Sequence, residues 1–431
     1  MSPFEMCKRL AAVFSAASLR GASLEAAVLA VSGGPDSLAL LLAAQAWRKA
    51  ERSGRPPIRF YVATVDHRLR PQSAAEAAFV ANLCRDFDLP HRTLVWAAPA
   101  PAGNLPEEAR LARYDLLQTF ARRCNAGLVL TAHHEDDQLE THVMRARRGG
   151  GPTGLAAMRL VREMTRGIVL ARPFLDIPGA RLKASVAACG LAAADDPTNR
   201  DPAYERVRVR SGFEAGTIDR EAVRQAAGEA AEARARLETQ LAAVLSEFAA
   251  HRILECREDG TIRLKRTALV ELGGDLAFHL VRRALAAVSG ASHWPEAAGV
   301  ERILSRLRGI EAAVSATLGG AIVAADDTAE FCREFGRCGI AGQEVADDVT
   351  PLLFDGRFEI DVDRWRGSDA RLVAFGSLGR GNRRERTLPV LLSAGRLLAV
   401  PRSLTRKAPE AAETLSLRSL AEWRLRRDLP R

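Results

Sequence analysis

The chain has 431 residues, enough for two to three domains, and 47% of them are hydrophobic, which is ample for stable cores. No apolar run approaches the length that spans a membrane, and the N-terminus is too mixed for a secretory signal, so we expect a soluble cytoplasmic protein with no membrane partner. The net charge is +9 and nearly all of the positive charge is arginine, which favours phosphate-bearing partners but also follows from a GC-rich genome.

The first predicted elements are a strand, a tight loop and a helix between residues 28 and 40. The loop residues are Ser32, Gly33, Gly34, Pro35, Asp36 and Ser37. Glycine lets the backbone bend and come close to a ligand, and the free N–H groups at the start of a helix attract anions. We therefore predict a phosphate site in which the serines donate hydrogen bonds and Asp36 binds magnesium, with a plain turn as the alternative.

Three further strand-like runs follow at residues 58–65, 92–95 and 128–132, separated by helical patterns at 74–86 and 107–124. This alternation predicts an α/β fold with a parallel sheet, helices on both faces and ligands at the carboxyl ends of the strands. The Ser32 loop, the Asp66-His67 pair and the segment that begins at His133 each follow a strand. We expect them to line one crevice.

The segment AHHEDDQLET at residues 132–141 is the second strong signal. A helix that begins near Asp136 places Asp136 and Glu140 one turn apart, and likewise His133 or Asp137 with Thr141. Acidic residues at a helix start are often only caps. Beside a phosphate loop, however, carboxylates can bind magnesium, accept a proton from an attacking amine or orient a cationic substrate.

The rest of the chain changes in pattern. Residues 218–250 predict a long amphipathic helix, with a coiled-coil dimer helix as the rival interpretation. Residues 251–345 mix helices with short strands, and residues 351–431 contain apolar strands punctuated by glycine. We expect a catalytic domain at 1–215, a helical linker with a middle domain at 216–345, and a small α+β domain at 346–431.

The motifs, taken in order, resemble those of the tRNA(Ile)-lysidine synthase family of PP-loop ATP pyrophosphatases. The matching segments are SGGPDS at 32–37, VDHRLR at 65–70, EEARLARYDLL at 107–117, AHHEDDQLET at 132–141, GGGPTGLAAM at 149–158, ARPFLDIPGARL at 171–182 and DDPTNRDPAYERVRVR at 195–210. Two positions depart from the family pattern. Arg68 stands where the family usually has glycine, and Val207 stands where it has asparagine after Arg206.

The resemblance implies an adenine nucleotide alpha hydrolase-like fold, ATP and Mg²⁺ as cofactors, and L-lysine and tRNA(Ile) with a CAU anticodon as partners. The wobble cytidine would be adenylated and then converted to lysidine. ATP would bind at the residue 32–37 loop, with magnesium at Asp36. The implied catalytic residues are Asp36, His133, Asp137, Glu140 and Arg206, and the implied substrate-binding residues are Arg110, Arg113, Arg208 and Arg210.

The resemblance further implies that the two later domains contact tRNA and that the protein is a homodimer. Candidate tRNA contacts are Arg380, Arg383, Arg384 and Arg386, with an exposed solubilising loop as the alternative. For the segment RVRVR at 206–210, solvated charge is the alternative interpretation.

Two other function classes stay open. Another PP-loop adenylating enzyme that acts on a small molecule would share the Ser32 loop, and a non-catalytic RNA-binding protein would keep only the fold. The seven cysteines include no CxxC pair, which argues against a structural zinc or iron–sulfur site and against sulfur transfer.

Overall fold

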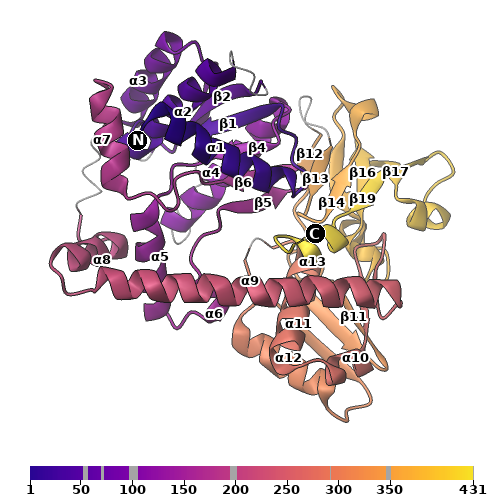
Figure 1. The fold of residues 1–431 in the computed structure, drawn as a ribbon. Coiled ribbons are helices and arrows are strands. Elements are labelled where there is room, and N and C mark those ends of the chain that lie inside the picture. The colour runs from indigo at the N-terminus through magenta and orange to yellow at the C-terminus, as the bar shows by residue number, and fades with distance from the viewer. Residues whose placement is uncertain are drawn as a thin grey trace. The chain divides into compact units, whose positions relative to one another are not determined.

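The computed structural model describes residues 1–51, 57–68, 72–96, 105–194, 201–291, 293–345 and 351–430 (Figure 1). These residues form two compact units, Met1–Arg236 and Leu237–Pro430. Parts of two family-like motifs, residues 69–70 and 195–200, lie outside the described residues. No helix in the described ranges is both long enough and apolar enough to cross a lipid bilayer.

A six-stranded sheet with the order β3-β2-β1-β4-β6-β5 forms the centre of the first unit. Its strands are β1 (Ala26–Ala30), β2 (Arg59–Asp66), β3 (His91–Val95), β4 (Leu128–Leu130), β5 (Val161–Thr165) and β6 (Ile168–Ala171). All neighbouring strands are parallel except β5, which pairs antiparallel with β6. The predicted parallel sheet is confirmed, whereas the hairpin of β5 and β6 was not predicted.

Helices cover both faces of this sheet (Figure 1). The helices that pack on the sheet are α1 (Pro3–Ser18), α2 (Pro35–Glu51), α3 (Ser73–Asp86) and α7 (Gly179–Ala188) on one face and α4 (Leu105–Arg123) on the other. The chain also forms α5 (Glu135–Arg147), α6 (Pro152–Leu155), α8 (Glu205–Glu214) and the long α9 (Arg220–Ala250). Because side chains alternate along a strand, Ala27 and Leu29 of β1 join the core with α1, α2 and α7, whereas Ala26 and Val28 pack with α4.

The strand order reverses at β1, which lies between β2 and β4. The chain proceeds from β1 to β2 and β3 on one side and then returns to place β4 on the other side. In open α/β sheets, ligands bind at such a reversal, in the crevice outside the carboxyl ends of the strands. The segments that follow β1, β2 and β4 are the three polar segments singled out in the sequence.

The second unit contains two hydrophobic cores. The first core lies around the sheet β7-β8-β11-β10-β9. Its elements are β7 (Leu254–Cys256), β8 (Ile262–Lys265), β9 (Val314–Leu318), β10 (Ala321–Ala325), β11 (Thr328–Arg333), α10 (Arg266–Glu271), α11 (Gly274–Ser289), α12 (Ala297–Arg308) and α13 (Ala421–Arg426). The predicted long helix is confirmed as α9, and its last turns bring Leu241, Leu245 and Phe248 into this core.

The second core joins two smaller sheets, β12-β15-β16-β17-β18 and β13-β14-β19. The strands are β12 (Gln343–Glu344), β13 (Leu352–Phe354), β14 (Phe358–Ile360), β15 (Arg371–Ala374), β16 (Pro389–Ser393), β17 (Arg396–Val400), β18 (Glu413–Thr414) and β19 (Leu417–Ser419). The apolar strands expected within residues 351–431 are therefore present, β16 and β17 among them. The domain boundaries at residues 215 and 345 stay predictions.

Candidate active site

The loop after β1 is held by its own serines. The Ser37 hydroxyl accepts a hydrogen bond from the backbone N–H of Ser32 at 3.2 Å and donates one to the carbonyl of Gly34 at 2.9 Å. Gly33 has φ +92°, a conformation that favours glycine, and a Cβ there would lie 3.4 Å from Val80. The loop therefore turns sharply into α2, and the N-terminus of a helix favours an anion.

Two adjoining cavities open at this edge of the sheet. One, here named the loop cavity, has a volume of about 510 Å³ and is lined by the loop, by the ends of β2 and β4, and by Arg113 of α4. The other, the carboxylate cavity, has a volume of about 830 Å³ and is lined mainly by α5, α7, α8 and the start of α9. Both cavities are lined by Pro35, Asp36, Asp137, Ala194 and Arg206.

Glu140 is the most deeply buried acid of the carboxylate cavity, at 1% exposed. Its carboxylate accepts a hydrogen bond from Nε of Arg210 at 2.9 Å and lies 3.4 Å from Nε of Arg206. Arg206 also reaches Asp137, with 3.4 Å between Nη1 and Oδ1. Burial raises the pKa of Glu140 above its usual range, and the two arginines oppose this only in part. A carboxylate with a raised pKa is a better proton acceptor.

His134 is a residue that the sequence analysis did not assign. It precedes α5 as its N-cap, and its backbone N–H donates to Asp137. Its ring nitrogens lie 3.5 Å from carboxylate oxygens of Asp36 and Asp136 and 3.6 Å from one of Asp137. Burial lowers the pKa of His134, but the three carboxylates outweigh this and raise it. His134 thus links acids that belong to both cavities.

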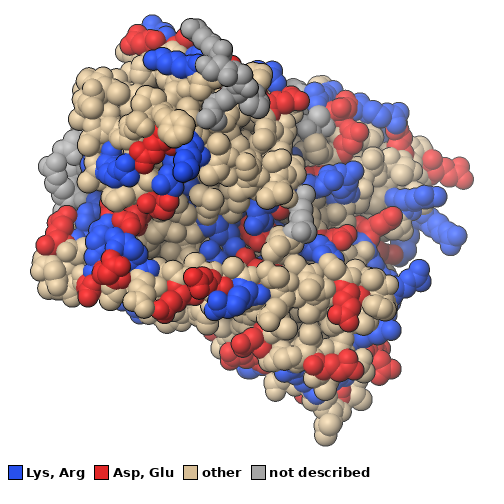
Figure 2. All heavy atoms as spheres, viewed as in Figure 1, with Lys and Arg blue, Asp and Glu red and all other residues tan. Residues whose placement is uncertain are grey.

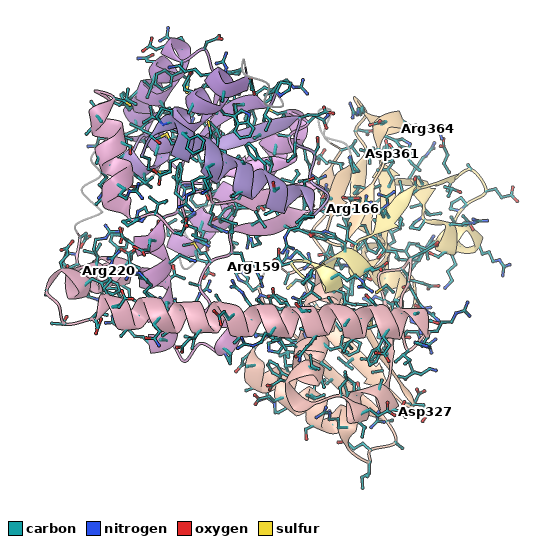
Figure 3. The ribbon with its side chains drawn as sticks, viewed as in Figure 1. Arg159, Arg166, Arg220, Asp327, Asp361 and Arg364 are labelled. Carbon is teal, nitrogen blue, oxygen red and sulfur yellow. The ribbon has the colours of Figure 1, made fainter. Side chains whose placement is uncertain are left out.

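Asp136 is held by partners far away in sequence. It accepts a hydrogen bond from the backbone N–H of Gly179, the first residue of α7, at 3.0 Å, and it pairs with Arg220 at the start of α9. Arg220 also lies 3.2 Å from Glu135, and Figure 3 labels it at this end of α9. Figure 2 shows acidic and basic side chains next to one another over α8 and the first turns of α9. Burial by itself would raise the pKa of Asp136, but the hydrogen bond and positive charge of Arg220 outweigh this effect. The net pKa is lowered, so this acid stays charged.

His133 faces the loop cavity and is electrostatically different from its neighbour. Nδ1 lies 2.9 Å from the hydroxyl oxygen of Thr131, with which it shares a hydrogen bond. Burial, reinforced by the positive charge of Arg172, lowers the pKa of His133 to about 3. The imidazole is therefore neutral near pH 7 and too weak a base to deprotonate an alkylammonium group. It acts as a neutral hydrogen-bonding group.

This low pKa makes the stability of the fold depend on pH. Between pH 6.5 and about 3 the unfolded chain binds a proton at His133 that the folded chain does not, so stability falls as the pH drops through this range. His133→Asn should remove part of that fall. The free energy of unfolding is measured by urea denaturation for the wild type and the variant at pH 7 and at pH 4.5. From pH 7 to pH 4.5, we expect the wild type to lose roughly 2 kcal/mol more of this free energy than the variant does. An equal difference at both pH values would contradict the assignment.

Arg68 occupies the position where the family usually has glycine, and the structure gives the reason for that preference. The residue has φ +52°, in the left-handed region that costs a residue with a Cβ about 1 kcal/mol. Its backbone N–H donates to Oδ1 of Asp66 at 2.8 Å, which ties down the turn after β2.

Arg68→Gly should therefore stabilise the fold by about 1 kcal/mol in urea denaturation. Arg68→Ala is the matched control, because it removes the same side-chain charge and keeps the unfavourable φ. Equal stabilities for the two variants would show that backbone strain does not matter at this turn.

The predicted site residues do not all meet in the cavities. Arg113 lines the loop cavity, and Arg206 and Arg210 line the carboxylate cavity. Arg110 and Arg208 are not among the described residues that line either cavity. Arg110 lies over the ring of Tyr114, 5.4 Å from its centroid, and Arg208 donates to the carbonyls of Pro202 and Ala203. The position of Val207 is on the wall of the carboxylate cavity.

The site residues that the sequence analysis missed include His134 and Arg220. A helix N-cap flanked by acids is a visible signal for His134. No local pattern points to Arg220, because it is 84 residues away from Asp136 in the sequence. Only the fold brings the two side chains into contact.

Asp36 is suited to hold a divalent cation together with phosphate groups. Its Oδ1 is buried and has no hydrogen-bond partner in the described part of the chain, and a carboxylate oxygen is a preferred ligand of Mg²⁺. Nowhere in the described ranges do three or more His, Cys, Asp or Glu residues gather in a way that could hold a metal ion. A magnesium ion here would therefore take most of its ligands from phosphate and water, as Mg²⁺ commonly does.

Comparisons with known proteins agree with this picture. Residues 6–213 match the PP-loop domain family. A tRNA(Ile)-lysidine synthase from Bradyrhizobium sp. is 52% identical over 183 residues, which cover 42% of this chain and 50% of the relative. One from Methylobacterium sp. is 39% identical over 338 residues, which cover 75% of this chain and 92% of the relative.

The chain thus spans about half the length of the first of these relatives and nearly all of the second. Among solved structures, a U34-tRNA thiolase NcsA from Methanococcus maripaludis aligns with 50% of this chain and 73% of its own, at 13% identity and a TM-score of 0.41, a likeness too slight to bear on function. From the parallel sheet, the glycine-bent loop and the match along most of the Methylobacterium relative, the chain belongs to the tRNA(Ile)-lysidine synthase family of PP-loop proteins.

Proposed function

We propose that this protein uses ATP to join L-lysine to C2 of the wobble cytidine in tRNA(Ile) with a CAU anticodon, through an adenylated cytidine. The observation that carries the proposal is the pair of adjoining cavities, one with an anion-binding loop and the other with buried carboxylates. Asp36, Asp137 and Arg206 lie on the wall that the two cavities share. A two-step reaction on one base needs such neighbouring subsites.

In the proposed first step, the C2 oxygen of cytidine attacks the α-phosphorus of ATP. An O–P bond forms, the bond to the β-phosphate oxygen breaks and diphosphate leaves. The Ser32–Ser37 loop and the first N–H groups of α2 would hold the leaving diphosphate. A magnesium ion at Asp36, when bound, neutralises phosphate charge. Catalysis of this kind consists mainly of alignment and charge neutralisation.

In the proposed second step, the ε-amine of lysine attacks C2, the C2–O bond breaks and AMP leaves. The ammonium group must first lose a proton. Glu140 is suited to accept it, because burial raises its pKa and it faces the carboxylate cavity. Asp137 is suited to bind the ammonium groups of lysine, and Arg206 the negative charge on the adenylate. His133, as a neutral imidazole, would donate or accept a hydrogen bond and would not be the base.

The test is to incubate the full chain with ATP, radiolabelled L-lysine and tRNA bearing a CAU anticodon. We expect label in the tRNA, release of AMP and diphosphate in equal amounts, and no label when ATP is omitted or when the anticodon is CAC. Adenylation of a small molecule without tRNA would support the rival PP-loop enzyme. RNA binding without diphosphate release would support a non-catalytic RNA-binding protein.

The later part of the chain is proposed to contact tRNA, but its four candidate arginines are not equivalent. Arg384 lies 2.5 Å from a carboxylate oxygen of Glu330, Arg383 also pairs with Glu330, and Arg386 lies over the ring of Phe335. Arg380 is exposed. Salt bridges already neutralise part of this cluster, so we expect Arg380 to contribute most to binding.

Arg380→Glu should weaken tRNA binding several-fold and flatten its salt dependence. Arg364→Glu is the control, because Arg364 is exposed and already pairs with Glu413. Fluorescence anisotropy with labelled tRNA at several salt concentrations measures both quantities. Equal binding by the wild type and the Arg380 variant would exclude this contact.

A homodimer, also proposed, would appear in sedimentation equilibrium as twice the chain mass.

A further inference from the structure

Four arginines gather around one tyrosine beside the loop cavity. Arg110 and Arg162 lie over the ring of Tyr114, 5.4 and 5.5 Å from its centroid. Burial alone would raise the pKa of Tyr114, but the positive charges of these two residues and of Arg172 and Arg113 lower it. We call these four arginines and Tyr114 the arginine cluster. They come from α4, from β5 and from the residue that follows β6.

Among the described residues, no carboxylate forms a salt bridge with any of the four guanidinium groups of the cluster. Arg172 is only 3% exposed, its Nη1 donates to the carbonyl of Arg159, and its side chain is hydrogen-bonded to Tyr114. Its buried Nε has no partner among the described residues. Within the described ranges, the buried Nε of Arg162 also has no hydrogen-bond partner. Arg159 and Arg166, which flank β5, are labelled in Figure 3 and locate this strand.

This arrangement is electrostatically unfavourable in the absence of an anion. Burial lowers the pKa of Arg172 to about 10. Tyr114, which is hydrogen-bonded to Arg172, opposes this fall, whereas Arg162 and Arg110 add to it by repulsion. Buried guanidinium groups are normally paired with carboxylates or phosphates, because an unpaired buried charge is costly. A guanidinium fork matches the geometry of phosphate oxygens. Among the described residues the cluster has no such partner, and a phosphate group fits its geometry.

The position of the cluster relates it to the candidate site. Arg172 directly follows β6, at the carboxyl edge of the sheet, where the backbone N–H of Thr131 donates to the carbonyl of Ala171. Arg113 lines the loop cavity, and Arg172, Arg110 and Arg113 all lower the pKa of His133 in the same cavity. The loop at residues 32–37 already provides an anion site for nucleotide phosphate.

We propose that the arginine cluster binds a phosphate group, and that this phosphate is a phosphodiester of the RNA strand next to the base that enters the loop cavity. The proposal rests on the proposed function for the identity of the RNA. The other source of the same chemistry is a phosphate of ATP. In the RNA case the cluster fixes the strand while the base reacts, and contacts to phosphate position a strand without reading its sequence.

The test uses the full chain with Arg162→Gln and, separately, Arg172→Gln. Arg85→Gln is the control, because Arg85 is exposed on α3 and carries the same charge. Binding of a labelled CAU anticodon stem-loop RNA is measured by anisotropy over a range of salt, and ATP binding is measured without RNA. Neither binding assay needs lysine, so each tests this site separately from catalysis. A wild-type protein that binds RNA and ATP but makes no lysidine would overturn the proposed function and leave the phosphate site standing.

Either cluster variant should weaken RNA binding by roughly 5- to 20-fold and reduce the salt slope by about 0.7 to 0.9, with ATP affinity unchanged. Weaker ATP binding with unchanged RNA binding would assign the phosphate to the nucleotide. Thermal unfolding without ligand tells a binding role from a structural one. Removing one of several repelling charges should not lower the melting temperature of the Arg162 variant, whereas a clear fall in that temperature, or unchanged binding of both ligands, would overturn the proposal.

Discussion

Asp36→Asn should reduce kcat/KM for lysine incorporation into tRNA by about 10²- to 10⁴-fold. Asp36 follows the glycine turn at the start of α2 and lies on the wall shared by the loop cavity and the carboxylate cavity. His134 lies 3.5 Å from Oδ2 of Asp36, whereas the buried Oδ1 has no hydrogen-bond partner among the described residues, so this oxygen is placed to meet a cation that accompanies phosphate. Asparagine has the same shape and no charge, which isolates the electrostatic contribution.

The measurement is incorporation of labelled lysine under single-turnover conditions, together with thermal unfolding to check the fold. Asp88→Asn is the matched control, because the Asp88 side chain is 93% exposed and pairs with Arg48 at the surface. It should keep wild-type activity. Activity of Asp36→Asn within threefold of wild type would remove Asp36 from the reaction.

Asp355→Asn should destabilise the second unit by about 3–5 kcal/mol. The Asp355 carboxylate accepts hydrogen bonds from Nε of Arg357 at 2.8 Å and from Nε of Arg333 at 3.0 Å. Arg357 is 2% exposed, and burial lowers its pKa, so the loss of Asp355 leaves a buried cation without its counter-charge. Asparagine tolerates the φ of +50° at this position, and the effect is therefore one of charge.

Urea denaturation followed by circular dichroism gives the change in the free energy of unfolding. Asp363→Asn is the control, because Asp363 is exposed and pairs with Arg366 three residues away, a type of pair that contributes about 0–1 kcal/mol. Equal losses for the two variants would mean that the buried pair with Arg357 contributes no more than a surface salt bridge.

The sequence was sufficient where local pattern and function coincide. The strand–loop–helix at residues 28–40, the alternation of strands and helices, and the long helix at 218–250 all depend on short-range periodicity or on glycine, and the structure confirms them. It was insufficient for β5 and β6, because a hairpin on the edge of a parallel sheet interrupts that alternation. The sequence was also insufficient for His134, because three carboxylates from two helices surround its ring and only the fold places them there.

By itself the sequence determined the groups present: a glycine-bent loop before a helix, acids at a strand end and an excess of arginine. Only the tertiary structure decided which of these groups meet. It joins Glu140 to Arg210, pairs Asp136 with Arg220 and gathers Arg113, Arg162 and Arg172 around Tyr114. The physical reason is that charge interactions depend on separation in space and on burial, and the sheet fixes both by bringing residues more than 50 positions apart to one edge.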